Sequence, residues 1–168
     1  MRFILIDRVL KIERSKSIEA CRKVSLSDDI FADHFPGNPI MPASLIIESF
    51  AQAATILLES SSEFRDKAVP GYISNAKFHR AVVPGHDLMI QMRIESVSEE
   101  AAVLSGIAQQ RDKKCASITL GMVTTPLDGF IPGEFLRFYL SIYDFWLRDC
   151  ELAGFERHPL RQRTSRES

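Results

Sequence analysis

The chain has 168 residues, of which 45% are hydrophobic and 26% are charged, and its formal net charge is -1. This length and composition are typical of one globular domain with a normal core, and the charge provides no overall attraction to nucleic acid or membranes. Cys21, Cys115 and Cys150 are odd in number and lack metal-ligand spacing, so they predict reduced thiols in a cytoplasmic protein. Asp7 and Arg8 interrupt the apolar start before a signal-peptide core can form, and no apolar stretch is long enough to cross a bilayer.

The first part of the chain predicts strands, a loop and one long helix. Residues 2–25 are typical of extended chain with a break near Arg14–Lys16. Prolines and a glycine mark residues 28–42 as a loop, and Pro42 lies where a helix can begin. From about Ala43 to about Ser60, apolar residues surround the predicted helix on nearly all sides. This distribution indicates a central helix that other elements wrap.

The middle of the chain predicts a sheet. Residues 59–67 are polar and predict a linker, and strands are expected over residues 69–81, 88–95, 101–110 and 115–124. The clearest strand has Leu88, Ile90 and Met92 at a period of two. The order of strands, one buried helix and further strands indicates an α+β fold, with an antiparallel sheet packed on a single long helix.

The last forty residues predict an extension, so we divide the chain into residues 1–127 and 128–168. Residues 134–153 predict an aromatic-rich helix that ends at Gly154, and residues 157–168 predict a basic, disordered tail. The apolar arc of this helix is too wide for a helix that faces only solvent. Packing on the sheet or across a dimer is the favoured interpretation. A docking surface for a partner protein, or a membrane contact helped by the basic tail, is the alternative.

One histidine and one carboxylate stand out between residues 34 and 52. His34 lies in the loop rich in proline and glycine, and Glu48 lies on the apolar helix. Because burial of an ionised carboxylate is costly, we expect Glu48 either to have a raised pKa or to bind a partner. Gln52 lies one helical turn later, where it can donate a hydrogen bond to Glu48. A histidine and a carboxyl group in one site can act as a base and an acid.

The stretch His34-Phe-Pro-Gly-Asn-Pro-Ile-Met-Pro-Ala-Ser-Leu45, with Glu48 and Gln52 after it, resembles the active-site motif of the bacterial 3-hydroxyacyl-[acyl-carrier-protein] dehydratases of the FabZ type. A second block, Lys77-Phe-His-Arg-Ala-Val-Val-Pro-Gly85, resembles another segment of that family. Two separated blocks in the correct order are a specific signal. The resemblance implies a hotdog fold, in which a curved antiparallel sheet wraps a long central helix. It also implies a homodimer in which the histidine of one subunit faces the acid of the other, and hexamers of three dimers are common in the family.

The resemblance further implies dehydration of a 3-hydroxyacyl thioester to a trans-2-enoyl thioester, in fatty acid or related polyketide or polyene biosynthesis. His34 would remove a proton from C2, Glu48 would help the C3 hydroxyl leave as water, and N–H groups near Ala43 would polarise the thioester carbonyl. The substrate would arrive on the phosphopantetheine of an acyl carrier protein, with no metal or other cofactor. The residues implied to bind substrate are Phe35, Gly37, Met41, Ala43, Ser44, Gln52 and Phe78.

Three departures from the family pattern concern the substrate range: Ala43, Ser44 and Ala81 stand where the family has glycine, an aliphatic or small residue, and proline. Two other functions stay open. A hotdog thioesterase would use a carboxylate to direct water at the carbonyl, and a non-catalytic subunit or regulator would only bind acyl thioesters. Five basic side chains would either bind an acidic carrier protein or form a solvated face. They are Lys77, Arg80, Arg111, Lys113 and Lys114.

Overall fold

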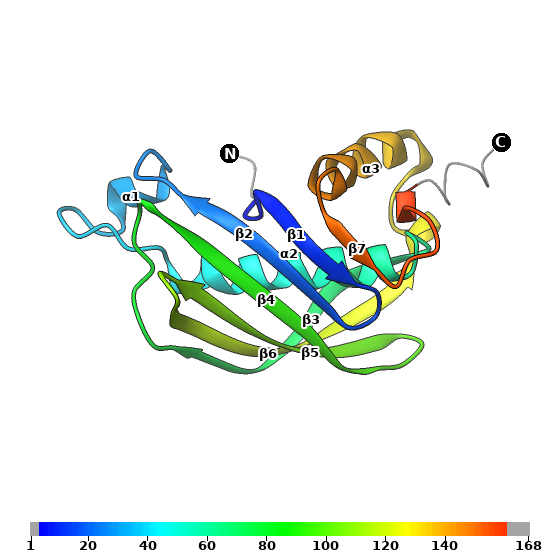
Figure 1. Cartoon of the computed structure of the whole chain (residues 1–168), viewed down its shortest axis with the longest axis horizontal. Helices are drawn as coiled ribbons and strands as arrows, with labels where there is room; N and C mark the ends of the chain where they lie inside the picture. Colours follow the sequence, from blue (N-terminus) through cyan, green and yellow to red (C-terminus); the bar gives the residue numbers. More distant parts are fainter. Residues whose placement is uncertain (1–3, 161–168) are drawn as a thin grey trace.

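The computed structural model describes residues 4–160. One curved sheet has seven strands in the order β3-β6-β5-β4-β2-β1-β7. The helix α2 lies along its inner side, and α1 and α3 lie at opposite ends of the molecule (Figure 1). In chain order the elements are β1 (Arg8–Glu13), β2 (Ser17–Val24), α1 (Ile30–Asp33), α2 (Ala43–Ser61), β3 (Asp66–Phe78), β4 (His86–Val97), β5 (Ala101–Gln110), β6 (Lys113–Pro126), the short 3-10 helix η1 (Leu127–Gly129), α3 (Gly133–Leu147) and β7 (Glu151–Ala153).

The core lies between α2 and the inner face of the sheet. In β4, Leu88, Ile90 and Met92 are buried under α2 while Arg93 is exposed, so the predicted period of two is confirmed. The side chains of Phe50 and Leu57 on α2 are also buried. Buried residues occur all around α2, which confirms a central helix wrapped by the sheet.

The segment after the apolar run of α2 differs from the predicted linker. The helix continues to Ser61, and β3 already begins at Asp66. Glu59, which the sequence places in a polar linker, has no exposed surface in the folded chain. A fully buried glutamate needs partners that compensate its charge, and these come from α3 and β3, as described below.

The predicted helix over residues 134–153 is wrong at its C-terminal end. The helix α3 ends at Leu147, and Glu151–Ala153 form β7, which pairs in parallel with β1. This pairing gives the outer edge of β1 a partner, and Arg14 N donates to Ala153 O over 2.9 Å. The first part of the predicted tail is packed rather than disordered, because Leu160 is buried, while residues 161–168 lie outside the described part of the chain.

The helix α3 packs on the body of its own chain, as the favoured interpretation expected. Tyr143 and Leu147 are buried, and the indole of Trp146 donates a hydrogen bond to Ile6 O at 2.8 Å. Other sides of α3 expose Phe135 and Phe145. Between residues 4 and 160, no helix has both the length and the apolar character needed to cross a membrane.

Candidate active site

His34 follows α1 and is fixed by two contacts with one residue across its loop. Ile40 N donates to His34 O at 3.0 Å, and His34 Nδ1 lies 2.9 Å from Ile40 O. A carbonyl oxygen only accepts hydrogen bonds, so Nδ1 carries the proton in this contact. In the neutral ring Nε2 is then the basic nitrogen, which gives the half-buried imidazole a defined atom for proton abstraction.

A cavity of about 420 Å³ lies beside His34. The start of α2 forms one of its walls, and Met41 N donates to Val82 O at 2.8 Å, which holds that wall against the segment after β3. No side chain caps α2, and its first turn contains no acidic residue. The N–H groups of Ala43 and Ser44 have no partner within the helix, so the positive end of the helix dipole is available to a developing negative charge. The cavity is also lined by Phe78, the last residue of β3, and by the four residues that follow it: His79, Arg80, Ala81 and Val82.

Glu48 lies on α2 and is half-buried. Gln52 Nε2 donates to Glu48 Oε1 at 2.9 Å, so the expected contact one turn later is confirmed. Gln52 Oε1 in turn accepts from Leu5 N at 2.8 Å. Because both ends of the Gln52 amide are engaged, this residue holds the carboxyl group of Glu48 in one orientation.

Glu48 faces a second cavity, of about 290 Å³, which lies between α2, the start of β3 and α3. His34 is not among the residues that line it, and Glu48 is not among those that line the His34 cavity. One copy of the chain therefore directs the two candidate catalytic groups into two separate cavities.

The structure divides the residues implied to bind substrate. Met41, Ala43 and Phe78 line the His34 cavity, and Gln52 lines the Glu48 cavity. The remaining three line neither cavity. Phe35 stacks on His34, with ring centroids 4.3 Å apart. Gly37 adopts a positive φ of 78° in an exposed turn, and Ser44 is exposed.

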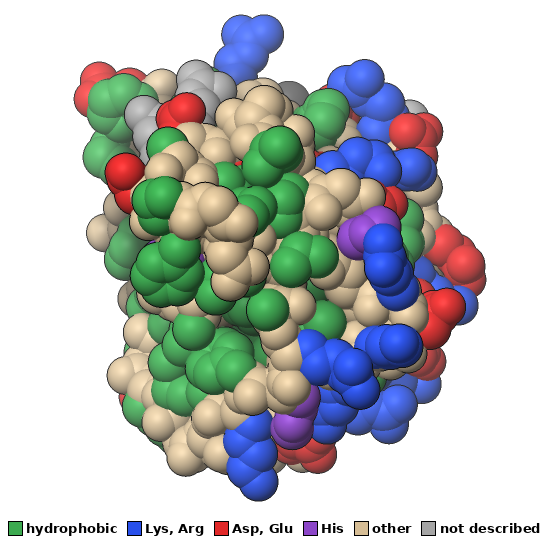
Figure 2. All heavy atoms as spheres, turned by 90° about the vertical axis from the view of Figure 1, so that its left-hand side faces the viewer, with side chains coloured by type: hydrophobic (Ala, Val, Ile, Leu, Met, Phe, Trp, Pro, Cys, Tyr) green, Lys and Arg blue, Asp and Glu red, His purple; other side chains and the backbone are tan. Residues whose placement is uncertain are grey.

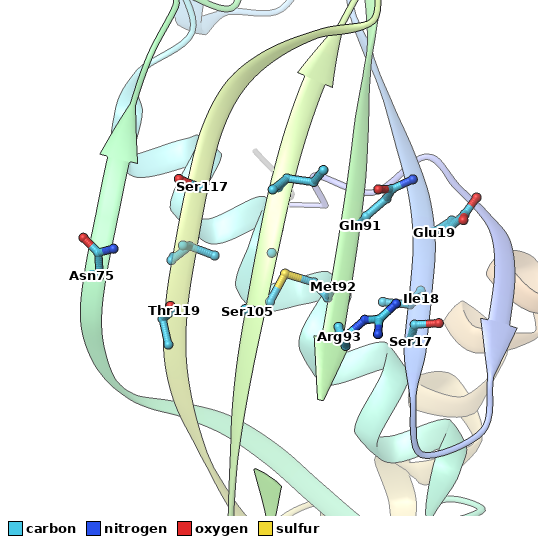
Figure 3. Close-up of a pocket in the computed structure, with 13 residues that line it drawn as sticks. Ser17, Ile18, Glu19, Asn75, Gln91, Met92, Arg93, Ser105, Ser117 and Thr119 are labelled. Carbon is cyan, nitrogen blue, oxygen red and sulfur yellow. The ribbon is translucent and has the colours of Figure 1, made fainter. Parts of the chain in front are cut away.

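A third cavity, of about 410 Å³, lies on the outer face of the sheet, on the side away from α2 (Figure 3). Its lining mixes polar and apolar side chains from neighbouring strands, with Glu19 on β2 and Arg93 on β4 as the charged members. Neither His34 nor Glu48 reaches this face, so it is not the acid–base site. Within residues 4–160, no group of three or more His, Cys, Asp or Glu side chains is arranged to hold a metal ion.

Sequence reasoning missed a buried polar cluster around Glu59, which we call the Glu59 cluster and which contains Glu59, Lys67, Tyr139 and Tyr143. Both tyrosine hydroxyls donate to Glu59 Oε2, and Lys67 Nζ lies 2.6 Å from Oε1. Burial, followed by the charge of Glu59, raises the pKa of both tyrosines, so they keep their protons and act as donors. The available signal was two tyrosines four residues apart on one helix face, but nothing in the sequence connected them to Glu59.

Comparison with known proteins identifies the family. The FabA-like domain family matches residues 1–115. The 3-hydroxyacyl-[acyl-carrier-protein] dehydratase FabZ of Wolbachia pipientis wMel is 40% identical over 122 residues, which are 72% of this chain and 85% of that protein. FabZ of Clostridium kluyveri strain NBRC 12016 is 42% identical over 115 residues, covering 68% of this chain and 80% of that protein.

Solved structures confirm the hotdog fold. A hot-dog-like protein from Thermanaerovibrio acidaminovorans superposes with a TM-score of 0.59 at 19% identity, covering 76% of this chain and 93% of that one. A Streptococcus mutans UA159 protein bound to acetyl CoA also gives a TM-score of 0.59, at 16% identity, with coverage of 71% and 88%. The fold, the family match and the level of identity agree with the two sequence blocks. The chain therefore belongs to the FabA-like family of hotdog proteins, together with the FabZ dehydratases.

Proposed function

We propose that this chain dehydrates a 3-hydroxyacyl thioester on acyl carrier protein to the trans-2-enoyl thioester in fatty acid biosynthesis, the activity named for its FabZ relatives. The observation that carries the proposal is the His34 imidazole, whose Nδ1 is engaged by Ile40 O, beside the uncapped start of α2. A base next to unpaired N–H donors suits removal of a proton from the carbon beside a carbonyl group.

The proposed reaction uses only groups of the chain. His34 Nε2 takes the proton from C2, and the electron pair moves into the thioester carbonyl, where N–H groups at the start of α2, near Ala43, stabilise the negative charge. The pair then forms the C2–C3 double bond as the C3–O bond breaks, and Glu48 supplies the proton that makes the leaving hydroxyl water. Transfer of the proton from the imidazolium back to the carboxylate restores the starting state.

We infer that two copies of the chain share each site, because a single copy directs His34 and Glu48 into different cavities. β3 is an edge strand of the sheet, and its Tyr72 and Ile73 side chains are 57% and 47% exposed. An exposed edge strand with large apolar side chains is suited to pairing with another strand. Pairing of β3 with β3 of a second copy would continue the sheet and bring His34 of one copy toward Glu48 of the other. The hexamers common in the family would contain three such dimers.

We also infer that the carrier docks at the end of the molecule that holds the His34 loop. Figure 2 views this end, where Lys and Arg side chains gather on one side of the face, next to an area of hydrophobic side chains. Arg80 lines the His34 cavity, so positive charge lies beside the space that a phosphopantetheine arm would enter. Exposed basic residues of this end include Lys77, Arg80, Arg111, Lys113 and Lys114. The three cysteines are free thiols, which supports a cytoplasmic setting.

The experiment that tests the function separates it from its two rivals. Purified protein is incubated with a 3-hydroxyacyl thioester on acyl carrier protein, and both the enoyl absorbance and free thiol are followed. We expect enoyl absorbance to rise without release of thiol. Thiol release would instead establish a thioesterase, and bound but unchanged substrate would establish a non-catalytic binder.

Reversing charge at the start of β6 is expected to weaken the carrier interaction. In a Lys113→Glu, Lys114→Glu variant, KM for the carrier-bound substrate should rise about tenfold or more, because complementary charge accelerates encounter. KM for the same acyl group on N-acetylcysteamine, which has no carrier protein, should stay unchanged. The matched control is Arg137→Glu, an exposed residue of α3 at the other end of the molecule. Equal effects of the two changes would contradict docking at the His34 end.

A further inference from the structure

The Glu48 cavity has α3 as one of its walls. Along α2 it is lined by Glu48, Gln52 and Thr55, and the opposite wall consists of side chains from α3. These side chains are Tyr139, Ile142, Tyr143 and Trp146. Because α3 spans Gly133–Leu147, it lies beyond residues 1–115, the part that matches the FabA-like family. This wall is therefore a feature of the C-terminal extension of this chain.

The α3 wall is fixed to the body of the protein at two places. The Glu59 cluster joins Tyr139 and Tyr143 of α3 to the end of α2, and the indole of Trp146 bonds to Ile6 O. Phe64 packs edge-on against the Tyr143 ring, with centroids 4.8 Å apart. A wall anchored in this way has a defined position, so it can limit the shape of a ligand.

The chemistry of the lining favours an alkyl chain. Lys67 also lines this cavity, but its ammonium group bonds to both Glu59 and Tyr139 Oη. The hydroxyls of Tyr139 and Tyr143 are likewise directed to Glu59. With its polar groups occupied, the α3 wall offers aromatic rings and the aliphatic side chain of Ile142. The volume of about 290 Å³ lies near the lower end of small-molecule cavities, about 300–1,000 Å³.

Resting on the proposed function, we propose that the acyl chain of the substrate extends past Glu48 and ends against α3, and that Ile142 and Trp146 set the chain length this enzyme accepts. The reacting C3 carbon lies at Glu48, so the rest of the acyl chain has to continue into space adjoining that carboxyl group. The cavity between α2 and α3 adjoins Glu48 and ends on apolar side chains. The substrate class is thus a 3-hydroxyacyl thioester with a chain of limited length.

Trp146 provides a direct test, since it is the single tryptophan of the chain. We titrate the wild-type protein with butanoyl, octanoyl and dodecanoyl thioesters that lack the 3-hydroxyl group and cannot be dehydrated. Trp146 fluorescence should change when the acyl chain is long enough to reach α3, and it should stay constant with the butanoyl thioester. Calorimetry should show that the long-chain and butanoyl thioesters both bind. The proposal would be overturned if thioesters of every length bind and leave the Trp146 fluorescence unchanged. This readout needs no activity, so it is independent of the outcome of the dehydration assay.

Variants of Ile142 test the same wall by kinetics. Ile142→Ala should raise the ratio of kcat/KM for the dodecanoyl substrate to kcat/KM for the octanoyl substrate by about tenfold or more, and Ile142→Trp should lower this ratio. The reason is that one methylene in an apolar pocket changes kcat/KM by about 10–200-fold. The matched control, Phe145→Ala, removes a side chain from the exposed side of α3. Dehydration with an unchanged length profile in both Ile142 variants would overturn the proposal while leaving the proposed function intact.

Discussion

His34→Ala and Glu48→Gln are each expected to lower kcat about 10²–10⁴-fold, the usual contribution of one positioned acid or base. The His34→Ala variant lacks the Nε2 atom that takes the C2 proton. The Glu48→Gln variant lacks the carboxyl proton needed by the leaving hydroxyl. Enoyl formation from a 3-hydroxyacyl thioester measures both changes. His86→Ala serves as the control, since His86 begins β4 and lines neither of the two catalytic cavities. Full activity in either variant would remove that residue from the mechanism.

Mixing the two inactive variants tests whether the site is shared between subunits. A hybrid dimer contains one site with both residues changed and one site with both intact, so about a quarter of the wild-type activity should return after random reassociation. The proteins are unfolded and refolded together, and each variant refolded alone is the control. If each site instead used His34 and Glu48 of the same copy, the mixture would stay as inactive as its components.

Glu59→Gln is expected to lower the free energy of unfolding by about 3–5 kcal/mol, the cost of removing one member of a buried ion pair. The Glu59 carboxylate is fully buried, and Lys67 is its charged partner. The amide keeps the shape of the side chain but removes the charge that compensates the Lys67 ammonium, and it offers a weaker acceptor to both tyrosine hydroxyls. Denaturant unfolding, followed by circular dichroism and by Trp146 fluorescence, measures the change.

The control for this prediction is Glu134→Gln, an exposed glutamate at the start of α3, where the change should stay within about 0.5 kcal/mol. Tyr143→Phe should have an intermediate effect of about 1–3 kcal/mol, because it removes one donor from a carboxylate that stays buried. Equal stability of Glu59→Gln and the control would contradict a structural role for the Glu59 cluster.

The sequence predicted those elements whose signal is local. The central helix was expected from about Ala43 to about Ser60 and spans Ala43–Ser61, because a long apolar run after a proline is unambiguous. The strand over residues 101–110 was predicted with its observed bounds. The sequence predicted that residues 151–153 end a helix, because Gly154 is the first helix stop signal after residue 134. Pairing with β1, far away in sequence, decided their conformation instead.

The candidate site was partly accessible to the same reasoning. The resemblance predicted roles for His34 and Glu48, and the spacing of four between Glu48 and Gln52 predicted the hydrogen bond that the structure contains. That the two groups face separate cavities depends on how α2 is rotated against β3 and α3, and a one-dimensional pattern does not contain this rotation. The Glu59 cluster was not predicted for a related reason, because its tyrosines lie 80 and 84 residues from Glu59 in the sequence.

The pairing of β7 with β1 has a consequence for how the protein matures. During synthesis β1 emerges long before residues 151–153, which are more than a hundred residues later in the chain. Until then the outer edge of β1 carries unpaired N–H and C=O groups, the kind of edge on which foreign strands assemble. Closing that edge also draws α3 onto the body of the fold, so the same late event protects the nascent sheet from aggregation and completes the wall beside Glu48.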